Sequence, residues 1–257
     1  MSDTVRVDTT EPGIAVVTID RPHARNALDV KTVAALGRTM AAADVDPTVR
    51  AIVLTGADGN FCVGSDIKEM LREGISCLRS DDRVTGWNAI ENLETPWIAA
   101  VDGMALGAGL ELALMADMLI CSEGACVGLP EVKIGVMPGD GGTQRLSRLV
   151  GQQAAMRLIL TGEILPATEA VRLGVALPSS RGQVALDAAL DVARKIAKNA
   201  PLACRLARDA VRRGLEMSLN DGMRLEAAHL AKLFKTRDQQ EGMSAFTEKR
   251  APEFTGR

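Results

Sequence analysis

The sequence predicts an α/β fold followed by a helical C-terminal region. Up to about residue 150, short apolar runs that end at Gly or Asp alternate with segments of helical periodicity. Beyond that point helical signals dominate. The 257 residues suffice for a sizeable core, and because only 2% of them are aromatic, we expect this core to be mainly aliphatic.

The first elements form a strand–helix–strand unit. Residues 13–20, GIAVVTID, have the β-branched content of a strand, and Pro22 follows in the turn that ends it. Apolar residues recur at helical spacing over 29–43, and Asp29 is placed to cap that helix. Residues 50–56, RAIVLTG, form an apolar run closed by Gly, which is typical of a buried strand.

The alternation then repeats. Residues 95–103 predict a second buried strand, which leads through a Gly-containing turn into a helix over 106–117 that begins near Gly107. Residues 118–123 predict another strand. In such an architecture the loops at strand ends hold the functional site.

Helices are predicted for most of the remaining chain. Their segments are 151–161, 183–199, 202–214 and 221–235. Pro201 interrupts the pattern between two of them, and we therefore predict a core over 1–196 and a helical tail over 197–257 that packs on it.

Composition argues against several classes of protein. The 33 acidic and 30 basic residues leave a net charge of −3, which does not favour an electrostatic nucleic-acid binder. The basic spacing in the tail is expected to form a solvated or subunit-contact face rather than an RNA site; it comprises Arg205, Arg208, Arg212 and Arg213.

Neither a membrane protein nor a disulfide-bonded or metal-binding protein is indicated. No secretory signal or bilayer-length apolar run is recognisable, so a cytoplasmic location without a membrane partner is expected. The five cysteines lack CxxC pairs, and His23 and His229 lie far apart, so we expect reduced thiols and no metal. No local motif supports a Cys–His nucleophilic pair.

Two glycine-containing segments begin predicted helices. In residues 60–70, NFCVGSDIKEM, Gly64 precedes a helix that Ser65 or Asp66 caps. Residues 103–111, GMALGAGLE, combine three glycines with small side chains. Helix N-termini present unpaired N–H groups, and two of them suit an oxygen that becomes negative during a reaction. By spacing alone, such glycines more often serve tight helix–strand packing.

Two glutamates are candidates for acid/base chemistry. Glu111 lies in the otherwise apolar segment LGAGLELALMAD, where a carboxylate must find solvent, a partner or a substrate. Burial there would raise its pKa toward neutrality. Glu131 follows a proline in 129–146, ahead of a tight loop over 138–142, and taken alone it reads equally well as a solvated helix-start residue.

These segments, in this order and spacing, resemble the crotonase (enoyl-CoA hydratase/isomerase) superfamily, and most of all its enoyl-CoA hydratases. With IDRPHARNAL at 19–28 and EGMSAFTEKR at 241–250, the resemblance covers nearly the whole chain. It implies a crotonase-like ββα spiral core with a C-terminal helical oligomerisation region.

The resemblance also implies roles for individual residues. Ser65 and Ala108 match the two backbone N–H donors that polarise a thioester carbonyl. Glu111 and Glu131 match the pair that holds the attacking water, with Glu111 as base and Glu131 as the proton donor to the α-carbon. Gly139 matches a backbone contact to the same water.

Coenzyme A contacts are implied for two regions. The matching residues are Ala24, Arg25, Val63, Asp66, Ile67, Lys68, Phe234 and Lys249. The two lysines suit the phosphates, although either side chain by itself reads as a solvated surface charge. Cys62 and Trp87 read as packing residues.

One departure concerns Asp140, which stands where the family commonly has a small neutral residue. A carboxylate there is expected to raise the pKa of Glu131, to contact a polar acyl group, or to face solvent. The variable stretch 71–94 is expected to shape the acyl pocket through Leu71, Ile75, Leu78 and Trp87.

The implied activity is the reversible hydration of trans-2-enoyl-CoA thioesters to 3-hydroxyacyl-CoA. No metal or redox cofactor is implied, because coenzyme A is part of the substrate. The resemblance further implies a homotrimer or a dimer of trimers. Two alternatives stay open, namely another crotonase-type reaction such as double-bond isomerisation, and a non-catalytic acyl-CoA-binding protein.

Overall fold

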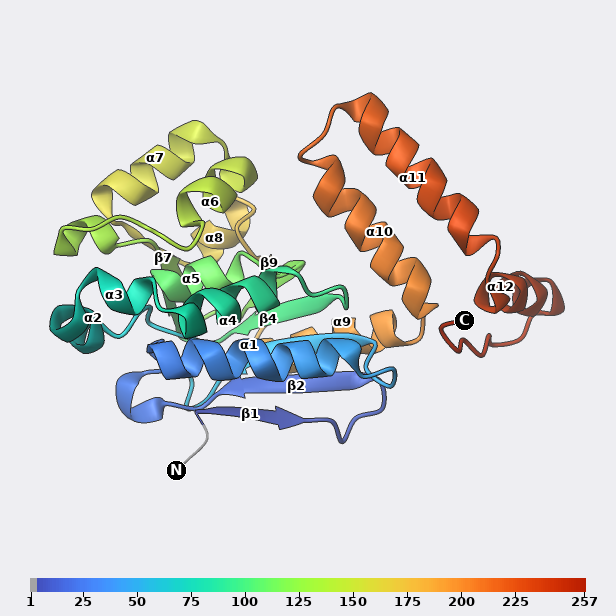
Figure 1. Ribbon diagram of the computed structural model, residues 1–257, viewed down its shortest axis with the longest axis horizontal. Coiled ribbons are helices and arrows are strands. Elements are labelled where there is room, and N and C mark those ends of the chain that lie inside the picture. The colour runs from blue at the N-terminus through green and yellow to red at the C-terminus, as the bar shows by residue number, and fades with distance from the viewer. Residues whose placement is uncertain (1–3) are drawn as a thin grey trace.

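The computed structural model describes residues 4–257, and its centre is a six-stranded sheet in the order β1-β2-β3-β4-β6-β9 (Figure 1). Only β1 runs antiparallel to its neighbour; the other pairs are parallel. The strands are β1 (Val5–Asp8), β2 (Ile14–Ile19), β3 (Ala51–Gly56), β4 (Trp97–Val101), β6 (Met118–Cys121) and β9 (Leu177–Pro178). The predicted strands at 13–20, 50–56, 95–103 and 118–123 are therefore confirmed, with bounds shifted by up to two residues.

A second sheet of three strands, β5-β7-β8, stands beside the first. Its strands are β5 (Met104–Leu106), β7 (Cys126–Gly128) and β8 (Ile164–Pro166). The turn from β4 into β5 requires Gly103, which has φ +57° and would place a Cβ 2.1 Å from the carbonyl oxygen of Gly59. The helix predicted over 106–117 is much shorter in the structure, where α5 spans Ala108–Ala113.

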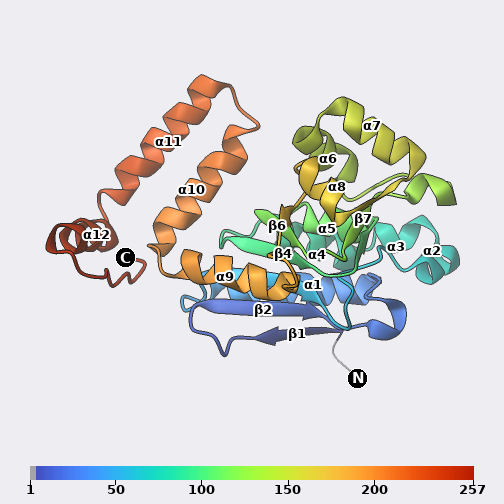
Figure 2. The ribbon, with the colours of Figure 1, turned by 180° about the vertical axis from the view of Figure 1, so that it is seen from behind.

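Helices cover both faces of the large sheet. α1 (Val30–Val45) and α4 (Asp81–Glu91) lie on one face, and α9 (Ala185–Ala197) lies on the other (Figures 1 and 2). The core is aliphatic on both sides, as expected, and α9 contributes mainly alanines to it. β3 and β4 are buried along almost their whole length, which explains their continuous apolar runs.

The helix pair α1–α4 packs unusually closely. A Cβ at Gly37 of α1 would lie 2.5 Å from the Cα of Gly86 in α4, so the two backbones touch where both residues lack a side chain. α1 begins as predicted, since the Asp29 carboxylate accepts a hydrogen bond of 2.7 Å from the N–H of Thr32. α4 is thereby held against a well-anchored helix.

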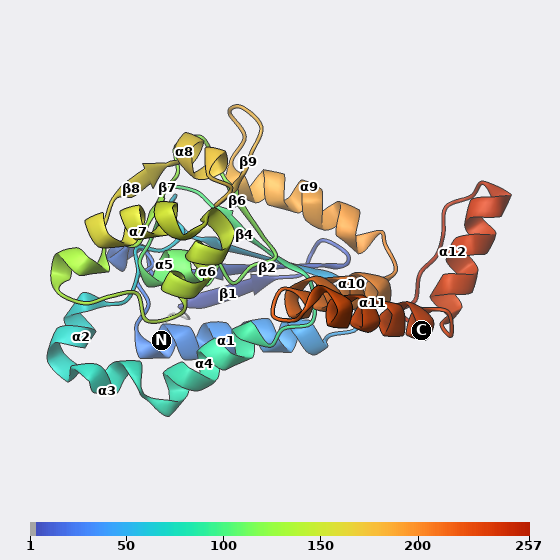
Figure 3. The ribbon, with the colours of Figure 1, turned by 90° about the horizontal axis from the view of Figure 1, so that it is seen from above.

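The remaining helices of the α/β part lie toward the end of the molecule away from α12 (Figure 3). They are η1 (Pro22–Ala24), α2 (Ile67–Glu73), α3 (Ile75–Leu78), η2 (Glu131–Ile134), α6 (Gly142–Val150), α7 (Gln152–Thr161) and α8 (Ala167–Arg172). Among these, α7, the helix α2 capped by Asp66 and the turn at Pro22 were predicted, whereas α3, η2, α6 and α8 were not.

The tail consists of α10 (Pro201–Gly214), α11 (Leu219–Leu233) and α12 (Arg237–Glu248), which project away from the sheets (Figure 1). Pro201 opens α10, so the predicted break between α9 and α10 is confirmed. The division into a core and a tail near residue 197 stays a prediction. Within residues 4–257, no helix combines the length and apolar character needed to cross a bilayer.

Candidate active site

The glycine-containing motifs and both candidate glutamates converge on one cavity of about 470 Å³, within the range of small-molecule sites. It opens between α2–α3, the start of α5 and the segment 130–140. Its lining includes Val63, Gly64, Ser65, Ile67, Met70, Ile75, Leu78, Gly107, Ala108, Glu111, Pro130, Glu131, Lys133, Ile134, Val136, Met137, Gly139 and Asp140. The fold therefore brings together motifs that are up to 77 residues apart, from Val63 to Asp140.

The two predicted oxyanion-hole residues lie side by side. A Cβ at Gly64, the residue before Ser65, would lie 3.6 Å from the backbone nitrogen of Ala108. The two loops are joined by a hydrogen bond of 3.0 Å from the N–H of Leu106 to the carbonyl oxygen of Cys62. Among residues 4–257, the N–H groups of Ser65 and Ala108 have no hydrogen-bond acceptor. Two free donors at one cavity wall suit a developing oxyanion.

Glycine is required at the residue directly before each of Ser65 and Ala108. Gly64 has φ +107° and Gly107 has φ +53°, conformations that residues with a Cβ rarely adopt. A Cβ at Gly107 would also lie 3.1 Å from Oε1 of Glu131. The glycines thus do more than permit tight packing, because they leave room for groups at the cavity wall.

Glu111 lies on α5 and is only 1% exposed. Its Oε1 accepts hydrogen bonds from the N–H of Asp140 at 2.8 Å and of Gly142 at 2.7 Å. Burial is the main cause that raises the pKa of Glu111, to about 7; the charges of Asp140 and Glu131 raise it further, and the two backbone donors oppose them. A carboxyl that titrates near neutrality suits general base catalysis.

Glu131 opens η2 and also lines the cavity. Both of its carboxylate oxygens are buried, and among the described residues neither has a hydrogen-bond partner. Burial raises the pKa of Glu131, and the charge of Asp140 adds to the shift. A buried carboxyl without a protein partner suits a proton donor to a bound molecule. Gly139 also lines this cavity.

Asp140 is not a free carboxylate. Its Oδ1 and Oδ2 accept hydrogen bonds from Nη1 and Nη2 of Arg83 at 2.9 Å and 2.6 Å. The expectation that Asp140 faces solvent is therefore wrong, because a buried arginine lies against it. The expectation that its charge raises the pKa of Glu131 is confirmed in direction. Sequence reasoning did not select Arg83.

The residues predicted to contact coenzyme A in the segments 19–28 and 60–70 lie partly in the cavity wall and partly beside it. Val63 and Ile67 line the cavity, and the N–H of Val63 donates to the carbonyl oxygen of Arg25 at 3.3 Å, so Ala24 and Arg25 lie next to this wall. Lys68 is exposed at the start of α2.

Asp66 has a structural role. Its carboxylate caps α2 by accepting from the N–H groups of Lys68 and Glu69, and it pairs with Arg21 at 3.1 Å. Arg21 also pairs with Asp29, the cap of α1. Arg21 is 8% exposed, so this buried arginine fixes the two helix starts beside the cavity. Arg21 was not selected from the sequence. The one signal that could have indicated it is its position in the 19–28 motif, directly before Pro22.

The acyl side of the cavity is only partly as predicted. Ile75 and Leu78 line it, but Leu71 is 89% exposed and Trp87 is buried behind the wall. The prediction that Leu71 and Trp87 shape the pocket is therefore wrong. Further apolar lining that the sequence did not reveal comes from Met70, Ile134, Val136 and Met137.

Phe234 and Lys249 do not join this cavity within the chain. Phe234 follows α11 and is 55% exposed, and Lys249 follows α12. These helices lie at the opposite end of the molecule from α2 and α3 (Figure 3). One chain therefore does not bring the two tail positions to the predicted site.

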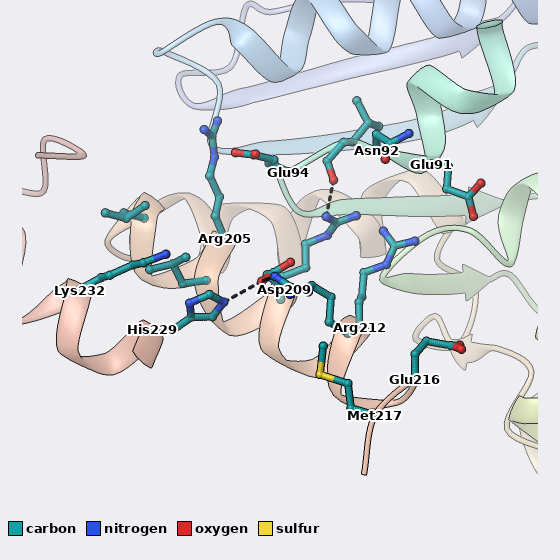
Figure 4. Close-up of a pocket in the computed structure, with 15 residues that line it drawn as sticks. Glu91, Asn92, Glu94, Arg205, Asp209, Arg212, Glu216, Met217, His229 and Lys232 are labelled. Atoms are coloured by element: carbon teal, nitrogen blue, oxygen red, sulfur yellow. Dashed lines mark hydrogen bonds and ion pairs between the residues drawn. The ribbon is translucent and has the colours of Figure 1, made fainter. Parts of the chain in front are cut away.

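A separate groove runs between the C-terminal end of α4 and the helices α10 and α11 (Figure 4). The basic tail residues that line it face the core rather than forming a free basic stripe. Arg208 pairs with Asp117 at 2.7 Å, Arg205 donates to a backbone carbonyl of the core, and only Arg213, which pairs with Asp209 at 3.3 Å, is largely exposed. The predicted solvated or subunit-contact face is thus wrong for Arg208, whose guanidinium pairs with Asp117 of its own chain.

Among residues 4–257, the other nucleophilic and metal-binding side chains form no second centre. Cys62 is fully buried, and this burial raises the pKa of its thiol to about 12, in keeping with a packing role. His229 is bound through Nε2 to Asp209 at 2.7 Å. Over the part of the chain that the structure describes, no three His, Cys, Asp or Glu side chains are arranged to hold a metal ion.

The chain is similar to known proteins along its full length. The family model described as enoyl-CoA hydratase/isomerase matches residues 9–257. A probable enoyl-CoA hydratase of Rhizobium meliloti is 44% identical, with 96% of each chain covered, and the 2,3-dehydroadipyl-CoA hydratase of Escherichia coli is 39% identical, with 95% of this chain and 96% of that protein covered.

The fold is likewise that of solved enoyl-CoA hydratases. The crystal structure of the enzyme from Bacillus anthracis superposes with a TM-score of 0.94 at 34% identity, covering 99% of this chain and 100% of that one. The expected crotonase-like α/β architecture with a helical C-terminal region is thereby confirmed. The chain belongs to the enoyl-CoA hydratase/isomerase family.

Proposed function

We propose that this protein is an enzyme that reversibly hydrates trans-2-enoyl-CoA thioesters to 3-hydroxyacyl-CoA. The observation that carries the proposal is the convergence of two buried carboxyls, Glu111 and Glu131, with the free N–H groups of Ser65 and Ala108 on one cavity. The names of the similar proteins, which are enoyl-CoA hydratases, support the same reaction.

In the proposed mechanism the thioester oxygen accepts hydrogen bonds from Ser65 and Ala108. Ionised Glu111 takes a proton from water as the water oxygen bonds to the β-carbon, and the double-bond electrons move toward the thioester oxygen. The enolate-like charge is stabilised by the two N–H groups. Protonated Glu131 then delivers its proton to the α-carbon, so that one water molecule has been added. Gly139 is proposed to contact this water.

The activity is expected to depend on pH through Glu111. Because the base must be ionised and its pKa is raised to about 7 by burial, kcat/KM should fall about tenfold for each pH unit below about 7. Initial rates on crotonyl-CoA between pH 5 and 9 measure this dependence. An acid limb centred near the ordinary glutamate value of 4.5 would contradict the assignment.

The acyl group is proposed to be apolar. The cavity wall carries Met70, Ile75, Leu78, Val136 and Met137, and both Nη atoms of nearby Arg83 are occupied by Asp140. A substrate carboxylate would meet the carboxylates of Glu111 and Glu131 in this cavity, and the one cation among its described lining residues is the exposed Lys133.

A panel of thioesters tests both the reaction and the pocket. Its members are crotonyl-CoA, longer straight and branched trans-2-enoyl-CoAs, 2,3-dehydroadipyl-CoA and a 3-enoyl-CoA, with loss of absorbance of the conjugated thioester as the readout for hydration. We expect the apolar trans-2-enoyl-CoAs to have the highest kcat/KM. Conversion of the 3-enoyl-CoA alone would identify an isomerase, and tight binding without any product would identify an acyl-CoA-binding protein.

Coenzyme A is proposed to bind along the segments 19–28 and 60–70, in contact with Ala24, Arg25, Val63, Ile67 and Lys68. Asp66 is expected to act there through its cap of α2 rather than by direct contact. Phe234 and Lys249 require a second copy of the chain, since they lie far from the cavity of their own chain. A cytoplasmic location stays a prediction.

An oligomer is proposed because the tail exposes many apolar side chains. They are Val211, Leu215, Leu219, Met223, Leu230, Phe234, Met243 and Phe246. Apolar surface of this extent marks an interaction site. We expect light scattering after size-exclusion chromatography to give three or six times the chain mass of 27.2 kDa. A monomer at micromolar concentration would contradict a trimer or a dimer of trimers.

A further inference from the structure

The loop at 138–142 determines how the Glu111 carboxylate is oriented. Both hydrogen bonds to Glu111 go to the same oxygen, Oε1, and both come from backbone N–H groups of this loop, those of Asp140 and Gly142. Two donors on one oxygen fix the plane of the carboxylate and leave Oε2 for a bound molecule. Any shift of the loop therefore shifts the proposed base.

A buried ion pair attaches this loop to α4. Arg83 is 4% exposed, and its two Nη atoms bind the two Oδ atoms of Asp140 at 2.9 Å and 2.6 Å. Such a bidentate arrangement fixes direction as well as distance. The guanidinium also lies 5.4 Å from the ring centroid of Trp87, one turn further along α4. Arg83 is thus held in place on its own helix.

A second contact connects the loop to the other end of α4. Arg145 donates to the backbone carbonyl of Asp140 at 2.9 Å and pairs with Glu91 at 2.6 Å. α4 in turn touches α1 backbone to backbone at Gly37 and Gly86. The loop is therefore fixed relative to the core through α4, although no residue of α4 is needed to touch the substrate.

We propose that Arg83 and Asp140 are positioning residues, whose buried ion pair holds the 138–142 loop so that its N–H groups orient Glu111 for attack by water. This inference rests on the proposed function. Asp140 is not a proton carrier in this arrangement, because both of its oxygens are occupied by Arg83. Nor is Arg83 placed to bind an acyl carboxylate, because it is 4% exposed and does not line the cavity.

The pair also sets the charge beside Glu111. The charged groups of the packed elements around it are Asp140, Glu131, Lys133, Arg83, Arg145 and Glu91. Removal of Arg83 leaves the negative charge of Asp140 uncompensated, which raises the pKa of Glu111. Removal of the Asp140 charge leaves Arg83 uncompensated, which lowers it. The two single variants therefore shift the acid limb of the pH profile in opposite directions.

The kinetic test compares Arg83→Met, Asp140→Asn and the double variant Arg83→Met/Asp140→Asn with the wild type on crotonyl-CoA. We expect each single variant to lower kcat about 10- to 100-fold with KM within about threefold, because the base is displaced while the binding wall is retained. The loss in the double variant should be no greater than in either single variant, since the two residues act as a unit. The control Asp82→Asn removes an exposed carboxylate from the same helix and should leave kcat unchanged.

Hydrogen exchange of a peptide that covers 136–146 provides a readout independent of the reaction. We expect faster exchange of the Asp140 and Gly142 amides in both single variants but not in Asp82→Asn. If Arg83→Met does not fold, Arg83→Lys, which keeps the charge but not the bidentate contact, should show the same changes at smaller size. Unchanged exchange, or pH profiles that shift in the same direction, would overturn the proposal. An inactive wild type with the expected exchange pattern would instead overturn the proposed function alone.

Discussion

Replacement of Glu111 by glutamine is expected to lower kcat for the hydration of crotonyl-CoA by about 10³-fold with little change in KM. Glutamine keeps the volume and an oxygen that accepts from Asp140 and Gly142, so the loop stays in place. What is lost is the basic oxygen that takes a proton from water. Steady-state kinetics at pH 8 measure the effect.

The matched control is Glu123→Gln, which changes an exposed glutamate in the loop after β6 and should retain wild-type kcat. If Glu111→Gln hydrated crotonyl-CoA at a rate near that of the wild type, the two-carboxyl mechanism would be abandoned.

The same variant is expected to unfold at a higher temperature. The folded-state pKa of Glu111 is raised from 4.5 to about 7, so ionisation of this buried group destabilises the fold as pH rises through that range, and the loss stays constant above it. Glutamine does not ionise. We expect a gain of about 1–3 kcal/mol in the free energy of unfolding at pH 8 that shrinks as the pH falls toward 4. Denaturant unfolding at both pH values measures it, and a gain independent of pH would contradict the assigned cause.

Replacement of Gly109 by alanine is expected to be strongly destabilising. The new Cβ would lie 2.2 Å from the backbone carbonyl oxygen of Cys62. This oxygen accepts the hydrogen bond from Leu106 that joins the loops of Ser65 and Ala108. Overpacking of this severity costs about 3 kcal/mol or more. The new side chain is also expected to move Ser65 and Ala108 apart, which should reduce the kcat of the folded variant.

Thermal unfolding measures the loss of stability in Gly109→Ala. A decrease of the melting temperature by roughly 6–12 °C is expected for a chain of this size. Gly124→Ala is the matched control, because a Cβ there would contact nothing within 4 Å. A melting temperature for Gly109→Ala equal to that of Gly124→Ala would show that the loops move apart without cost.

The sequence was informative wherever a signal is local. The strands β2, β3 and β4 were predicted from apolar runs, and the starts of α1 and α10 from Asp29 and Pro201, because caps and prolines act within one turn of chain. The helix predicted over 106–117 failed because hydrophobic residues of a short strand and a short helix follow each other there without a visible break. Periodicity does not separate two elements of so few residues.

The sequence by itself determined the α/β class, the helical tail, the two glycine-containing loops and the two glutamates as candidates. Only the tertiary structure decided which groups meet. Asp140 binds Arg83, 57 residues away, and Glu111 accepts from a loop 29 residues away. Such pairs leave no periodic trace, because their distance depends on how sheets and helices stack rather than on spacing along the chain. For the same reason burial, which raises the pKa of Glu111, became visible only in the folded chain.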